Sequence, residues 1–122
     1  MRDFKKLEVW QLGMEIVKDV YQLTSELPKD ERFGLKSQLT RAVISIPSNI
    51  AKGSAKESEK EFRLYLERAL GSAFEIEIQI MIVKELELAN YQLTKDLLLK
   101  IVKEQKKLGS FISSVKRRIP ST

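Results

Sequence analysis

Apolar side chains recur at steps of three and four residues along almost the whole chain, which is the spacing of one face of an α-helix. In the first quarter this stripe consists of Leu7, Trp10, Met14, Val17 and Tyr21. Breaks in the pattern divide the chain into four helical segments, at about 4–27, 34–52, 58–88 and 94–118. The connections are short, so the pattern predicts an all-α, antiparallel up-down four-helix bundle that forms a single domain over residues 1–122.

Polar residues, proline and glycine mark the ends of these segments. Pro28 ends the first helix, because the residue before a proline is pushed out of the helical region. Ser58 and Glu61 have the S-x-x-E spacing of a capping box at the start of the third helix. Gly53 predicts a left-handed cap after the second helix, and Thr94 is the expected cap of the fourth.

Pro47 lies inside the apolar pattern of the second helix, where it lacks an amide donor and crowds the carbonyl of Val43. Because Ile50 keeps the helical spacing beyond the proline, we expect the second helix to be kinked at Pro47 rather than broken. The side chains that can hydrogen-bond the freed backbone groups are Ser45, Ser48 and Asn49.

The third segment contains a competing signal, because the run EIEIQI from Glu75 to Ile80 alternates as a half-buried strand does. No turn residues flank this run, and no other segment offers a partner strand. We therefore expect a long helix that is apolar on two sides, one facing its own bundle and one facing another chain.

The composition argues against an enzyme. The chain has no cysteine and no histidine, which removes thiolate nucleophiles, the usual general base near neutral pH and the commonest metal ligand. Glu75 and Glu77 point to different faces of a helix, and no lysine is spaced to activate Ser45. We expect no catalytic residues, metal or cofactor. With no signal-like start and no membrane-length apolar run, we expect a soluble cytoplasmic protein without a membrane partner.

The net charge of +5 is unevenly distributed. Residues 34–56 hold four basic and no acidic side chains, residues 57–93 hold four basic and eight acidic ones, and residues 94–122 hold eight basic and two acidic ones. A polyanion would suit the basic segments. The predicted nucleic-acid contacts are Lys36, Arg41, Lys52, Lys56, Lys103, Lys107, Arg117 and Arg118. The alternative is a protein–protein interaction scaffold without a nucleic-acid role, in which the basic helices pair with the acidic third helix across subunits.

One motif occupies the second helix: Phe33-Gly34-Leu35, Gln38, Arg41-Ala42, Ser45-Ile46, Asn49-Ile50-Ala51 and Gly53, with Gly71-Ser72-x-x-Glu75 in the third. With this motif, the chain resembles the four-helix-bundle family of the 23S ribosomal RNA intervening-sequence proteins. The resemblance covers essentially the whole chain. The resemblance implies a bacterial up-down bundle that assembles as a homopentamer and has no defined biochemical role. A related branch, the accessory variability proteins of diversity-generating retroelements, binds nucleic acid and a reverse transcriptase. Lys52 stands where the family commonly has an acid.

We interpret seven motif positions as structural: Gln38, Ser45, Pro47, Asn49, Gly53, Gly71 and Glu75. Arg41 and Asn49 match the motif and are the leading functional positions. Arg41 is either a phosphate contact or paired with Glu75 across the bundle, and the structural alternative for Asn49 is a hydrogen bond to the backbone opened by Pro47. The sequence thus predicts a non-enzymatic homo-oligomer, a pentamer by resemblance, that binds RNA or DNA through basic surface of the second and fourth helices. A reverse transcriptase or another protein is a further partner that the resemblance implies.

Overall fold

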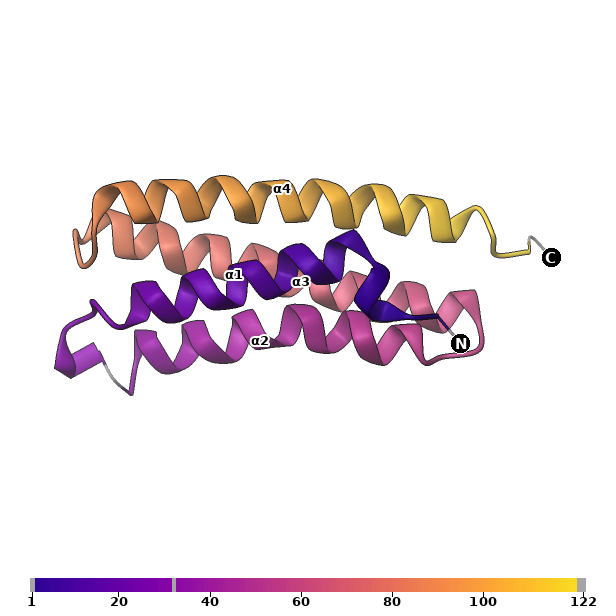
Figure 1. Ribbon diagram of the computed structural model, residues 1–122, viewed down its shortest axis with the longest axis horizontal. Coiled ribbons are helices and arrows are strands. Elements are labelled where there is room, and N and C mark those ends of the chain that lie inside the picture. The colour runs from indigo at the N-terminus through magenta and orange to yellow at the C-terminus, as the bar shows by residue number, and fades with distance from the viewer. Residues whose placement is uncertain (1, 32, 121–122) are drawn as a thin grey trace.

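The computed structural model, which describes residues 2–31 and 33–120, contains four α-helices and no strand within those residues. The helices are α1 (Glu8–Thr24), α2 (Leu35–Ser54), α3 (Glu59–Glu85) and α4 (Tyr91–Lys116), with short 3-10 turns η1 (Phe4–Lys6) and η2 (Lys29–Glu31) (Figure 1). The predicted all-α class is confirmed, and the alternating run in α3 is helical. Ile76 and Ile80 are buried and Ile78 between them is 58% exposed, so the run follows the four-residue spacing of a helix face and not the two-residue spacing of a strand.

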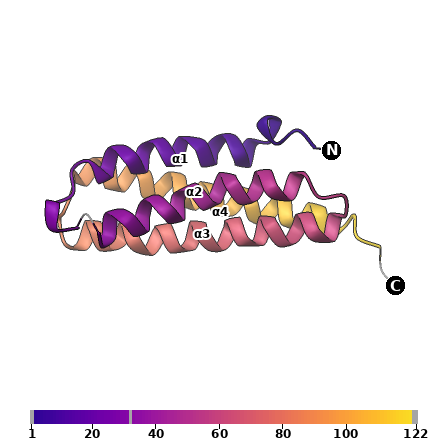
Figure 2. The ribbon, with the colours of Figure 1, turned by 90° about the horizontal axis from the view of Figure 1, so that it is seen from below.

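The four helices form a square in which α1 and α3 each lie between α2 and α4. Figure 1 therefore shows α2 and α4 at opposite edges, and Figure 2, turned by 90°, shows α1 and α3 at opposite edges. Contacts between α1 and α4 run in opposite directions along the chain, since Asp19 meets Lys100 whereas Glu8 meets Lys107. α1 and α4 are thus antiparallel, and the outward faces of α2 and α4 point away from each other.

Each helix contributes its apolar stripe to one continuous core. Ring packing closes one end, where Phe62 of α3 meets Phe111 of α4 edge to face at 5.5 Å between ring centroids. The largest fully buried side chains are Phe62, Ile16, Leu23, Leu39, Ile46, Ile50, Leu66, Ile76, Ile80, Leu97, Ile101 and Leu108. Each contributes roughly 1.5–3 kcal/mol by leaving water, so the core, rather than helix propensity, stabilises the bundle.

Capping side chains set the starts of α3 and α4, whereas α1 and α2 begin without a side-chain cap. The hydroxyl of Ser58 accepts the amide N–H of Glu61 at 3.0 Å, as the capping box predicts. The prediction for Thr94 is wrong, because Asn90 is the cap of α4 and its side-chain oxygen accepts the amide N–H of Leu93 at 2.9 Å. Thr94 lies inside the first turn and donates its hydroxyl back to the Asn90 carbonyl. Both residue types cap well, so the sequence could not choose between them.

Gly53 is not a left-handed cap, because α2 continues through it to Ser54 and no glycine among the described residues has a positive φ. Its role is close packing. A Cβ atom at this position would lie 2.7 Å from the Cβ atom of Tyr65 and 3.1 Å from the ring of Phe62. Glycine therefore lets the end of α2 approach the start of α3 more closely than any other residue could.

Pro47 is buried within a helix that runs uninterrupted from Leu35 to Ser54. The Ser45 hydroxyl donates to the Ala42 carbonyl at 2.7 Å, and the Asn49 amide donates to the Ser45 carbonyl at 2.8 Å. These bonds flank the Val43 carbonyl that the proline leaves without its helical donor, rather than satisfying it. The continuity of the helix agrees with the expectation that α2 does not break, and the kink stays a prediction.

Candidate nucleic-acid interface

The α2 set of predicted contacts, Lys36, Arg41, Lys52 and Lys56, divides into free and engaged residues. Lys36, Arg41 and Lys52 are exposed and form no ion pair with any described residue. Lys56 is half-buried, with its ammonium group 5.4 Å from the ring centroid of Tyr65. Three cations on this helix are therefore free to meet an anion.

Arg41 and Glu75 line one small hollow between α2 and α3, together with Gln38, Ala42 and Ser45. No ion pair joins the two charges within the described residues, and Glu75 instead accepts a long hydrogen bond from Gln79 at 3.4 Å. The two helices are held there by a hydrogen bond between the hydroxyls of Ser45 and Ser72. Arg41 is thus left available at the surface.

The α4 set, Lys103, Lys107, Arg117 and Arg118, divides in the same way. Lys107 pairs with Glu8 at 2.9 Å, and its charge and hydrogen bond lower the pKa of that carboxyl. Arg118 pairs with Glu59 at 3.5 Å. Lys103 and Arg117 are exposed and pair with no described residue. The charges of Lys107 and Arg118 are therefore engaged in ion pairs within the bundle.

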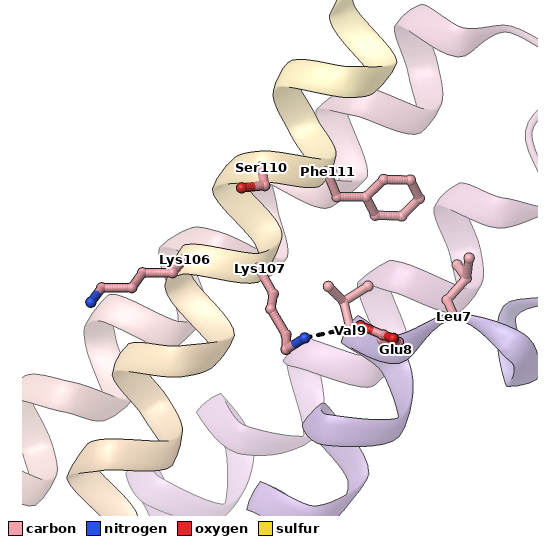
Figure 3. Close-up of a pocket in the computed structure, with 7 residues that line it drawn as sticks. All are labelled: Leu7, Glu8, Val9, Lys106, Lys107, Ser110 and Phe111. Atoms are coloured by element: carbon pink, nitrogen blue, oxygen red, sulfur yellow. Dashed lines mark hydrogen bonds and ion pairs between the residues drawn. The ribbon is translucent and has the colours of Figure 1, made fainter.

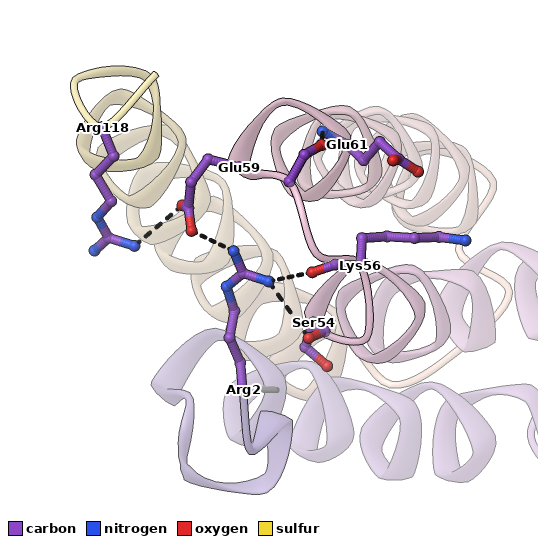
Figure 4. A network of polar contacts seen from close by, with 7 residues as sticks. Arg2, Ser54, Lys56, Glu59, Glu61 and Arg118 are labelled. Atoms are coloured by element: carbon purple, nitrogen blue, oxygen red, sulfur yellow. Dashed lines mark hydrogen bonds and ion pairs between the residues drawn. The ribbon is translucent and has the colours of Figure 1, made fainter. Parts of the chain in front are cut away.

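Arg118 belongs to a polar network that pins the start of the chain, shown in Figure 4. Arg2 donates to the Lys56 carbonyl at 2.7 Å, pairs with Glu59 and lies 4.1 Å from the ring centroid of Phe62. Glu59 thereby joins Arg2 and Arg118 on its two oxygens. The network ties the N-terminal segment to the α2–α3 connection and to the end of α4.

The outward face of α4 and its C-terminal cap residue, Arg117, carry a row of cations that we call the α4 stripe: Lys95, Lys103, Lys106 and Arg117. All four side chains are exposed, and none forms an ion pair with a described residue. The predicted contacts include neither Lys95 nor Lys106, although their spacing from Lys103 by eight and three residues is helical. The stripe extends over about 33 Å at 1.5 Å per residue.

The two free cation sets do not form one surface. Because α2 and α4 occupy opposite corners of the bundle, the α4 stripe and the α2 cations face in different directions (Figures 1 and 2). Within one chain, a nucleic acid on the α4 stripe would leave Lys36, Arg41 and Lys52 untouched.

A cleft of about 540 Å³ lies where α4 extends past the start of α1 (Figure 3). Leu7, Val9 and Phe111 form its apolar part, and its rim holds Lys106 and the ion pair between Glu8 and Lys107. Ser110 also lines the cleft, and its hydroxyl has no hydrogen bond to a base among the described residues. Among the described residues, no cluster of three or more carboxylates could hold a metal ion either.

The outer face of α3 carries a row of exposed apolar side chains, which we call the α3 strip: Phe74, Ile78, Met81 and Ile82. These side chains are between 42% and 58% exposed, and a shallow hollow lies beside them next to Leu86. Exposed apolar surface of this kind marks interaction sites. The expectation that α3 is apolar on two sides holds, and its contact with another chain stays a prediction.

Glu104 is the ionisable residue that the sequence analysis overlooked. Its side chain is fully buried, and neither carboxyl oxygen has a hydrogen-bond partner among the described residues. Burial raises its pKa to about 8, against a smaller lowering by Lys107. The sequence does indicate this burial, because Glu104 continues the core spacing of Leu97, Ile101 and Leu108.

The comparisons with known proteins agree with this architecture. No curated protein matches the chain. A crystal structure of a protein of unknown function from the S23 ribosomal protein family of Bacteroides thetaiotaomicron superposes with a TM-score of 0.79. It is 23% identical, and the match covers 85% of this chain and 97% of that one, which shows a shared fold. In the described part of the chain, no helix is long and apolar enough to cross a membrane.

A family model, the 23S rRNA-intervening sequence protein, matches residues 5–110. That range includes the whole motif of α2 and α3, so the resemblance read from the sequence is confirmed. The chain belongs to the 23S rRNA-intervening sequence protein family.

Proposed function

We propose that this protein is a non-enzymatic homo-oligomer that binds the sugar-phosphate backbone of nucleic acid, with the α4 stripe as the contact. The observation that carries the proposal is that Lys95, Lys103, Lys106 and Arg117 are exposed together on one helix face without an ion-pair partner. Such cations release counterions from phosphates when they bind, which is the main source of sequence-independent affinity.

Oligomerisation would strengthen this binding. Each chain has a net charge of +5, so an assembly of several chains multiplies the positive potential and the number of phosphate contacts. The α3 strip supplies the apolar surface for such contacts, and it lies on a different helix from the α4 stripe. Self-association through α3 would therefore leave α4 exposed. A cytoplasmic location fits this function, because bacterial RNA and DNA are found there.

Fluorescence polarisation with ribosomal RNA and DNA fragments over a salt series tests this function. We expect a dissociation constant of roughly 10⁻⁴–10⁻⁶ M at physiological salt, as is typical of non-specific binding, and much tighter binding at low salt. Replacing Lys103 and Lys106 by glutamate should abolish binding without unfolding the bundle. Absence of binding at low salt, or affinity that does not respond to salt, would refute the proposal.

A second candidate function is a protein-interaction scaffold, and the free cations of α2 favour it. Lys36, Arg41 and Lys52 face away from the α4 stripe and could meet the acidic side chains of α3 in a neighbouring subunit. Charge reversal at Lys36 and Arg41 separates the two functions. Collapse of the oligomer in light scattering would assign the α2 cations to subunit contacts, whereas loss of nucleic-acid binding with the oligomer intact would assign them to the nucleic acid.

A further inference from the structure

The geometry points to a duplex, lying along α4 for one helical turn, as the nucleic acid that the α4 stripe binds. This inference rests on the proposed function and adds the form, the orientation and the length of the ligand. It follows from the spacing of the four cations, from the acids beside them and from the side chains between them.

The cations are spaced as the backbones of a duplex are. Along the helix axis, Lys103 and Lys106 lie about 12 and 17 Å from Lys95, and Arg117 lies about 33 Å from it. A line parallel to a duplex axis meets one backbone or the other twice in each turn of about 34–36 Å. The two distances between successive backbone crossings differ, because the minor groove is narrower than the major groove. Lys95, the Lys103–Lys106 pair and Arg117 can therefore meet three consecutive backbone crossings.

The sides of the stripe carry carboxylates, of which Glu8 and Asp19 are balanced by Lys107 and Lys100, so a ligand that crosses the stripe meets less positive charge than one that follows it. On the side of α1, Glu8 and Asp19 pair with α4 lysines. On the side of α3, Glu77 accepts a hydrogen bond from Gln105 at 2.9 Å. Asp96, on α4 itself, accepts one from Gln92 at 2.8 Å. A polyanion laid across the bundle would meet these carboxylates, whereas one laid along α4 meets mainly the cations.

The side chains between the cations favour a duplex over a single strand. The outward positions between Lys95 and Arg117 hold Leu99, Ser110 and Ser113, which offer no ring on which a splayed base could stack. The exposed ring of Tyr91 lies one turn before Lys95, outside the stripe, with the Lys84 ammonium group 5.8 Å from its centroid. Proteins that hold single strands without sequence preference use such rings. A straight helix also keeps its cations in a fixed row, which matches a rigid ligand with about one charge per 1.7 Å of axis.

Fluorescence polarisation with labelled hairpins tests the inference on the full-length protein. DNA and RNA hairpins with stems of six and twelve base pairs are compared with single strands of twelve nucleotides, from 50 to 200 mM salt. Four phosphate contacts give a slope of log K against log salt near −3.6, which is a loss of affinity of about 150-fold over that range. We expect the twelve-base-pair stems to bind roughly tenfold more tightly than the single strands and with a steeper slope than the short stems.

Two variants locate the contact. Lys106→Ala should reduce the steepness of the slope by about 0.9, because one phosphate contact is lost. Lys18→Ala is the matched control, since Lys18 is an exposed lysine on the outward face of α1, and its slope should not change. The DNA and RNA arms show which duplex geometry fits better.

The outcomes distinguish failure of the duplex inference from failure of the proposed function. Equal or tighter binding of the single strands, or equal slopes for six and twelve base pairs, would overturn the duplex inference and leave the proposed function intact. Absence of binding to every probe at 50 mM salt would refute both. An equal change in slope for Lys18→Ala and Lys106→Ala would place the contact elsewhere than on the α4 stripe.

Discussion

Replacing Glu104 by glutamine should remove a pH dependence of stability that this one carboxyl creates. The side chain is fully buried on the core face of α4, and its Oε2 atom lies 3.2 Å from the place where a Cβ atom on Gly13 would be. Ile46 and Pro47 of α2 surround the same space, and neither offers a side-chain donor. The folded protein therefore holds the carboxyl in its neutral form up to about pH 8, which is where burial places its pKa.

The sign and size of the effect follow from this shift. The folded pKa is about 8 and the reference value is 4.5, so the folded state binds the proton more tightly than the unfolded state does. The stabilising effect of that proton is complete below pH 4.5 and is lost as the pH rises to 8. At about 1.4 kcal/mol per pH unit, the loss from this group is about 3 kcal/mol at pH 7 and approaches about 5 kcal/mol above pH 8.

Urea unfolding at pH 5, 6, 7 and 8 measures the effect on wild type and Glu104→Gln at equal protein concentration. Other titrating groups are common to both proteins and cancel in the difference. We expect the variant to gain about 3–4 kcal/mol relative to wild type between pH 5 and pH 8. Glu104→Leu should show the same pH dependence as Glu104→Gln. It should be more stable than Glu104→Gln at every pH, because it removes an unpaired polar group from the core. A stability difference that is constant across this pH range would refute the reasoning.

Three further predictions concern packing, a turn and self-association. Gly53→Ala should destabilise the bundle by about 1–3 kcal/mol in urea unfolding, because the new Cβ atom would meet Tyr65 at 2.7 Å. Gly109→Ala is its control and should stabilise by about 1 kcal/mol, since nothing lies within 4 Å of that Cβ position. Glu87 has a φ of 52° in the α3–α4 connection, which glycine adopts at lower steric cost. Glu87→Gly should therefore stabilise the protein by about 1 kcal/mol in thermal unfolding. Ile78→Asp should lower the mass measured by light scattering, and an unchanged mass would exclude the α3 strip from the subunit contact.

The bundle itself could be predicted from the sequence, because the spacing of apolar residues depends on each helix separately. Ser58 could be identified as a cap for the same reason, since the hydrogen bond spans only three residues. The role of Gly53 could not be predicted, because Tyr65, which approaches it, belongs to another helix. The choice of Thr94 over Asn90 was wrong because both residue types suit a helix start equally well.

The charges were harder to place than the core. Sequence alone counted Lys107 and Arg118 as free cations, but their partners Glu8 and Glu59 come from distant parts of the chain. Glu104 was overlooked because a charged residue is ordinarily assigned to the surface, although its spacing follows the core of α4. Local pattern thus predicts which face a residue occupies, whereas ion pairing depends on the arrangement of the helices.

Free cations on α4 bind the nucleic-acid backbone in the proposed function, and two double charge-reversal variants test this assignment. Affinity for a twelve-base-pair hairpin at 50 mM salt is measured for Lys103→Glu/Lys106→Glu and for the matched reversal Lys18→Glu/Lys29→Glu, which changes the net charge equally at two exposed lysines outside both cation sets. We expect the first variant to lose binding by at least about a hundredfold and the second to change by less than about threefold. Equal losses in the two variants would show that net charge alone attracts the nucleic acid, and would contradict the assignment to α4.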